Sequence, residues 1–195
     1  MQSSPKSPSK AQFFKSRHTP LQWLNSAQRL RHAGELLFNA YLRDSRKSPS
    51  DDPPEGLDNL DMDGPAALLF GLSIENLVKA IRLRKRLDQQ PDGEIKFPGN
   101  GHQMKKLLDG IQFRPTPDEA DLVQRLEQFV IWSGKYPVPK SESAVFLQQN
   151  GKSSELPPLA IAPWEKEIFD QLFDKLETTL GPLFVTEGSI IKFID

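Results

Sequence analysis

Histidine, the side chain most often used for proton transfer near neutral pH, occurs three times in this chain, as His18, His32 and His102. General acid–base catalysis would need one of them beside a nucleophile or a phosphate. The three histidines lie far apart in the sequence and the chain has no cysteine, so neither a histidine cluster nor a thiolate site for a metal is indicated. We therefore predict no metal and no cofactor, and no small-molecule substrate is identified.

A second group of chemically useful side chains lies between residues 75 and 86. Glu75 and Lys79 are four residues apart with the acid first, which is the favourable order for an ion pair on a helix. This spacing predicts a structural pair, with a functional role as the alternative. A cluster of cations follows, and its members are candidates for binding nucleic-acid phosphates or, alternatively, form a solvated helix end: Arg82, Arg84, Lys85 and Arg86.

Apolar residues at spacings of three and four predict the helices that must position these groups. They indicate helices over residues 20–43, 65–87, 102–108, 116–134 and 163–180. The second of these is apolar over so broad a face that we expect it to lie at the centre of the fold. Pro91-Asp92-Gly93 is expected to end it. The predicted fold class is all-α, an antiparallel helical bundle of about five helices.

The other segments are expected to extend or connect the predicted bundle domain, residues 19–140. Residues 1–18 read as a flexible basic arm, and residues 44–63 as a long acidic loop inside the domain. Residues 141–158 are a predicted linker. Residues 159–195 are predicted to form a C-terminal helix and a short irregular or β tail that pack on the same domain.

Charge is balanced over the whole chain but segregated along it. The formal net charge is −1, which argues against general coating of nucleic acid. Residues 1–47 nevertheless contain nine Lys or Arg against two Asp or Glu, and residues 48–64 contain six acids and no base. The chain has no run of about 18 apolar residues that could span a membrane, and it has no apolar signal segment. We therefore predict no membrane contact and a cytoplasmic location.

Three short motifs resemble those of HEPN domains, which are small helical bundles. Ile74–Ala80 is similar to the apolar–Glu–x–apolar–apolar–Lys–Ala pattern of the second helix in that family. Gly101–Leu107 resembles the Gly-His motif that begins the third helix, and Lys135-Tyr136-Pro137 resembles the Arg-Tyr-Pro at the end of the fourth. Order and spacing agree over residues 20–140. The resemblance implies a bundle that dimerises and, in many members, cleaves RNA.

The chain lacks the cleavage motif of that family, an arginine separated from a histidine by four to six residues. Before His102 the corresponding positions hold Ile95, Lys96 and Phe97. We therefore expect a non-catalytic HEPN-like interaction module, a homodimer or bound to a protein partner, in a bacterial toxin–antitoxin or antiphage system. The alternative is a protein that binds RNA, or that cleaves it at a rearranged site with His102, Lys135 and Tyr136 as candidate catalytic residues.

Overall fold

The computed structural model describes residues 19–44, 63–90, 94–133, 148–149, 152–153, 161–187 and 190–193. Its α-helices are α2 (Pro20–Asp44), α3 (Asp63–Arg84), α4 (Met104–Gly110), α5 (Pro117–Gln128) and α6 (Pro163–Leu180). A π-helical segment, η1 (Phe129–Ser133), continues α5. The strands form two small antiparallel pairs: β1 (Gln148–Gln149) pairs with β2 (Lys152–Ser153), and β3 (Phe184–Glu187) pairs with β4 (Ile190–Phe193). The fold is all-α, as the sequence predicts.

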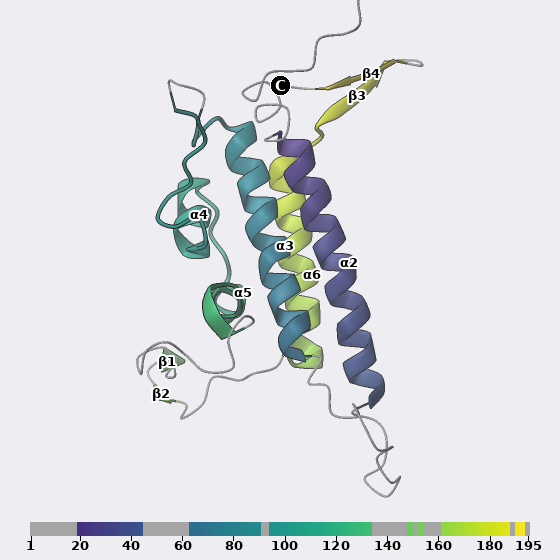
Figure 1. Ribbon diagram of the computed structural model, residues 1–195, viewed down its shortest axis with the longest axis vertical. Coiled ribbons are helices and arrows are strands. Elements are labelled where there is room, and N and C mark those ends of the chain that lie inside the picture. The colour runs from purple at the N-terminus through teal and green to yellow at the C-terminus, as the bar shows by residue number, and fades with distance from the viewer. Residues whose placement is uncertain are drawn as a thin grey trace, which may run out of the picture.

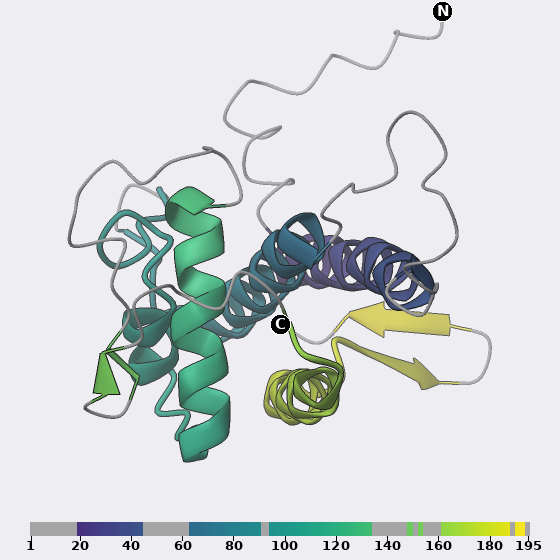
Figure 2. The same ribbon diagram turned by 90° about the horizontal axis from the view of Figure 1, so that it is seen from below.

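Helix α3 is the central element. The long helices α2, α3 and α6 lie side by side, and α4 and α5 pack on the side of α3 that faces away from α2 (Figure 1). The view along the bundle shows α3 between α5 and α2, with α6 below (Figure 2). The hydrogen bond from Asn76 to Ser26 and the contact of Phe70 with Gly34 show that α2 and α3 are antiparallel.

Burial explains why α3 takes this central position. From Ser73 to Leu83 every residue of α3 except Asn76 is buried, which confirms the prediction from its broad apolar face. The ring of Phe70 packs against Phe169 of α6 with centroids 4.4 Å apart. Helix α3 therefore has no solvent-facing stripe in its second half, and the polar residues there must find partners inside the protein.

The predicted starts of α2, α5 and α6 are confirmed. The hydroxyl of Thr19 accepts a hydrogen bond from the amide of Gln22 at 3.3 Å and so caps α2. At the start of α5, Thr116 and Glu119 form a reciprocal capping box with N···O distances of 3.3 and 2.8 Å. Helix α6 begins at Pro163 and ends before Gly181, which has a φ of 66°. These ends are set by local sequence, which is why the sequence predicts them.

The end of α3 differs from the prediction. The helix ends at Arg84, three residues before the predicted end at Leu87, because Arg86 adopts a left-handed backbone with φ 54° and the chain turns back there. The amide of Leu87 then bonds to the carbonyl of Arg82. Helix α4 also begins two residues later than predicted, at Met104.

Several predictions lie outside the described residues. They concern the basic arm (1–18), the acidic loop apart from its ends, and most of the linker. Asn150-Gly151, predicted as a hairpin turn, also lies outside the described residues, although the antiparallel pairing of β1 with β2 fits a hairpin. In the described part of the chain, none of the helices combines the length and the hydropathy needed to cross a lipid bilayer.

Candidate functional site

Glu75 connects the motif at residues 74–80 with the motif at residues 101–107. Its Oε1 atom accepts a hydrogen bond from Lys79 Nζ at 2.6 Å, and its Oε2 atom lies 2.9 Å from His102 Nδ1. The side chains of Glu75 and Lys79 are 3% and 7% exposed, so the predicted pair is inside the protein rather than on a helix surface. The imidazole of His102 is 41% exposed and closes the cluster toward solvent. The structure thus brings together three of the residues that the sequence singled out.

Two aromatic rings cover the ammonium group of Lys79. Its Nζ atom lies 5.2 Å from the ring centroid of Trp23 on α2 and 4.9 Å from that of Phe97 in the loop before α4. The two rings meet edge to face with centroids 5.4 Å apart. Cation–π attraction and the Glu75 carboxylate together offset the desolvation of this buried cation.

The loop before α4 places His102 through its backbone conformation. Gly99 and Gly101 have φ of 64° and 78°, values that side chains larger than glycine rarely allow. The side-chain oxygen of Asn100 accepts a hydrogen bond from the amide of His102 at 3.1 Å. A Cβ atom on Gly101 would lie 3.6 Å from Lys79 Nζ, so the loop runs directly over the cluster.

The contact with Glu75 determines the tautomer of His102. Glu75 also binds the ammonium of Lys79 and is therefore a carboxylate that only accepts hydrogen bonds, so His102 Nδ1 must carry the proton of the shared bond. In the neutral imidazole the other nitrogen, Nε2, is then the acceptor. A half-exposed imidazole oriented in this way can accept a proton or a hydrogen bond from a ligand.

A second carboxylate, Glu127 on α5, lies at the same site. Burial raises the pKa of Glu127, and the charge of Glu75 adds to this effect, while the backbone amides of Lys105 and Met104 oppose it. The amide of Lys105 donates to Glu127 Oε2 at 3.3 Å. The sequence analysis missed Glu127, Trp23 and Phe97, because they come from other helices or loops and no local spacing relates them to Glu75.

Arg82 has a structural position. Its guanidinium binds both carboxylate oxygens of Asp88, at 2.7 and 2.6 Å, and donates to the carbonyl of Leu107 at 3.1 Å. Arg82 and Asp88 are both buried. The side chain that we considered for phosphate binding instead closes the turn after α3 and holds α4 against it. Asp88 lies just after the end of α3, so this pair fixes the turn against the helix.

The other members of the cation cluster have different surroundings. Arg84 donates to the carbonyls of Leu180 and Pro182 and so caps the C-terminal end of α6. Lys85 is exposed and reaches the carbonyl of Ile111 at 3.3 Å, and Arg86 is exposed. Arg86 and Lys85 therefore face solvent, whereas Arg82 does not. Phosphate binding by this cluster stays a prediction for the two exposed members.

Among the described residues there is no group of three or more His, Asp or Glu that could hold a metal ion. His32 and Glu35 have a spacing that occurs in metal sites, but Glu35 bonds to Arg31 at 3.1 Å and His32 is exposed on the outer side of α2. Lys135 and Tyr136, the other candidate catalytic residues, lie outside the described residues.

The fold and the site together define a helical-bundle protein in which a buried Glu–Lys pair of the central helix contacts a half-exposed histidine of the loop before α4. No protein-family model, no curated protein and no solved structure matches the chain. A function can therefore be proposed only from the residues of the site and their contacts.

Proposed function

We propose that this protein is a HEPN-like helical bundle that acts as an interaction module and does not cleave RNA. It works in the cytoplasm as a homodimer or with a protein partner, and its setting is a bacterial toxin–antitoxin or antiphage system, as the resemblance implies. The observation that carries the association is the exposure of large apolar side chains on the outer sides of two long helices. Leu36 on α2 is 58% exposed and Trp164 on α6 is 64% exposed.

The contacts of the Glu75 cluster support a structural role for the HEPN-like motifs. Both oxygens of Glu75 are engaged, one by Lys79 and one by His102. The cluster ties α3 to the loop before α4, and the two aromatic rings seal it on the side of α2. In the described part of the chain, no arginine is hydrogen-bonded or ion-paired within this cluster, and a cation that stabilises a scissile phosphate would have to come from elsewhere.

Static light scattering on the purified full chain tests the association. We expect a mass above that of the monomer at tens of micromolar protein. A strict monomer under these conditions would exclude self-association and leave only a different protein as the partner.

The oriented imidazole of His102 favours a second candidate function, RNA cleavage at a rearranged site. Glu75 would hold the ring while Nε2 acts as the base, and Lys135 would replace the missing arginine. Labelled total RNA incubated with the protein without metal tests this function, with the His102→Ala and His32→Ala variants beside it. This candidate requires cleavage that His102→Ala abolishes and His32→Ala preserves, with unchanged circular dichroism. Intact RNA, or equal cleavage by both variants, would exclude it.

RNA binding without cleavage is the remaining alternative, and the exposed Lys85 and Arg86 are its best-placed cations. Affinity should then fall steeply as salt rises, because phosphate contacts release counterions. Charge reversal at Arg86 should weaken binding, whereas the same change at the exposed Arg114 serves as the control. Equal effects of the two reversals would argue against a site at the end of α3.

A further inference from the structure

The outer side of α2 carries one straight stripe of exposed residues without an acid. Its positions alternate in steps of three and four, so they lie along a single line on the helix. The stripe consists of Gln22, Asn25, Arg29, His32, Leu36, Asn39 and Arg43. Within the described part of the chain, these side chains make no hydrogen bond or ion pair. The α2 stripe is therefore cationic and free for contact.

The outer side of α6 carries a stripe of the opposite charge. Its exposed positions have the same alternating spacing and consist of Trp164, Glu167, Gln171, Asp174 and Thr178. This α6 stripe contains two acids and no base. Asp174 bonds to Arg31 at 3.3 Å, but its side chain is still 68% exposed. One face of the protein thus presents a cationic and an anionic stripe on neighbouring helices.

Side-chain bridges between α2 and α6 establish which positions lie at the same level of the bundle. Gln28 bonds to Glu177 at 2.9 Å, and Arg31 bonds to Asp170 at 2.9 Å. Residue numbers on α6 fall as those on α2 rise, so the two helices are antiparallel. By this register Arg29 is level with Asp174.

The same register places the end of α2 level with the start of α6. Lys166 reaches Glu35 at 3.5 Å. Asn39 is one helical turn beyond Glu35, and Trp164 precedes Lys166 by two residues, so the two residues are at about the same level. The end of α2 and the start of α6 lie at the same end of the bundle (Figure 1).

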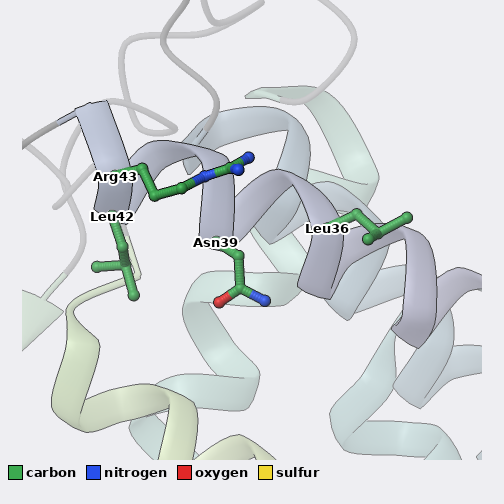
Figure 3. A pocket seen from close by; sticks show the side chains of 4 residues that line it. All are labelled: Leu36, Asn39, Leu42 and Arg43. Atoms are coloured by element: carbon green, nitrogen blue, oxygen red, sulfur yellow. The ribbon is translucent and has the colours of Figure 1, made fainter.

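A hollow on α2 lies at the level of Trp164. Leu36, Asn39, Leu42 and Arg43 line an open space of about 400 Å³ along one side of the helix (Figure 3). Two leucines supply apolar walls, Arg43 offers a cation for an aromatic face, and the amide oxygen of Asn39 can accept from an indole N–H. These groups suit a tryptophan side chain.

We propose that two copies of this chain associate through the α2 and α6 stripes, with Trp164 of each copy in the hollow of the other. The two copies are related by a twofold axis parallel to the helices, so residues at the same level of the bundle face each other. The cationic α2 stripe of each copy then lies against the anionic α6 stripe of the other. Arg29 of one copy then faces Asp174 of the other. Such an interface is self-complementary, as twofold symmetry requires. The proposal rests on self-association in the proposed function and specifies its surface.

Sedimentation equilibrium of the full chain and of the Trp164→Ala variant tests the anchor. Because a buried tryptophan anchor is typical of interface hot spots, we expect the dissociation constant to rise by at least about 30-fold. The control is Leu87→Ala, which truncates an apolar side chain that is 46% exposed and belongs to neither stripe. Dimerisation that survives Trp164→Ala unchanged would overturn the proposed surface but leave self-association intact, whereas a monomeric wild type would overturn both.

Charge exchange tests the pairing of the stripes independently of the anchor. Arg29→Asp and Asp174→Arg should each weaken the dimer, because each places like charges opposite one another. The double variant should recover most of the lost affinity, since it restores opposite charges at both symmetric positions. Additive losses in the double variant would show that the two residues do not face each other.

Disulfide trapping gives a geometric test, because the natural chain has no cysteine. Two single variants, Asn39→Cys and Glu167→Cys, are mixed and oxidised at low concentration. We expect a covalent heterodimer to form faster than either homodimer. Gln124→Cys, exposed on α5, replaces one partner in the control mixture. Equal trapping in both mixtures would overturn the proposed arrangement.

Discussion

Gly71 of α3 lies directly against the backbone of Leu126 on α5. A Cβ atom at Gly71 would be 2.9 Å from the Leu126 carbonyl oxygen and 2.7 Å from the side chain of Val130. These distances are shorter than van der Waals contact, so only glycine allows α3 and α5 to approach so closely. Because α5 also carries Glu127, this close contact helps to place the second carboxylate of the candidate site.

Gly71→Ala should therefore destabilise the protein by about 1–3 kcal/mol, since a backbone oxygen cannot move aside as a side chain can. The control is Gly64→Ala in the first turn of the same helix, where the nearest described atom to the added Cβ would be a ring carbon of Phe129 at 3.9 Å. That change should be neutral or stabilise by up to about 1 kcal/mol. Urea unfolding measures both, and equal effects would contradict the close contact.

The buried Arg82–Asp88 pair yields a prediction about stability. Asp88→Ala leaves a guanidinium inside the protein without its countercharge, and we expect a loss of about 3–5 kcal/mol. Glu94→Ala breaks the exposed pair with Lys96, whose side chains are 62% and 65% exposed, and should change stability by less than about 1 kcal/mol. If Asp88→Ala proved as mild as Glu94→Ala in chemical denaturation, Arg82 would be solvated rather than buried.

Glu127→Gln should stabilise the protein near neutral pH. Because burial and the charge of Glu75 raise the pKa of Glu127, the folded state binds this proton more tightly than the unfolded state. The stability that protonated Glu127 contributes is then present below its pKa in the unfolded chain and is lost as pH rises through its pKa in the folded protein. Glutamine carries no charge, so the variant should be more stable than the wild type near neutral pH. This difference in stability should disappear below about pH 4, where the wild-type carboxyl is protonated. Unfolding free energies across this pH range measure the difference.

Glu119, at the other end of α5, should behave in the opposite way. Burial opposes ionisation, but hydrogen bonds from Lys175 and Thr116 outweigh it and lower the pKa of Glu119. The stability that Glu119 contributes is present above its unfolded pKa of about 4.3 and is lost as pH falls through the folded pKa.

Glu119→Gln should therefore destabilise the protein near neutral pH by about 0.5–1.5 kcal/mol, and by less in acid, because glutamine keeps the bond from the Thr116 amide but loses the charge-assisted bond from Lys175. The same denaturation series as for Glu127→Gln measures the effect. A pH profile with the same sign as that of Glu127→Gln would contradict the contacts described for Glu119.

Predictions from the sequence were most accurate where neighbouring residues decide the outcome. The start of α2 at Pro20, the capping box of Thr116 and Glu119, and the start of α6 at Pro163 all depend on groups within one helical turn. The central position of α3 follows from the breadth of its apolar face. Helix α3 ends three residues earlier than predicted, where Arg86 adopts a left-handed backbone and Arg82 pairs with Asp88 in the turn that follows.

The sequence by itself determined the helices, their order and the Glu75–Lys79 spacing, because periodicity and caps act over a few residues. Only the tertiary structure decided that this pair is buried, that His102 completes it from 27 residues away, and that Trp23, Phe97 and Glu127 surround it. It also placed Trp164 level with the hollow on α2. The physical reason is that burial, pKa shifts and cavities arise from groups on different elements, and no local pattern in the chain specifies where those elements meet.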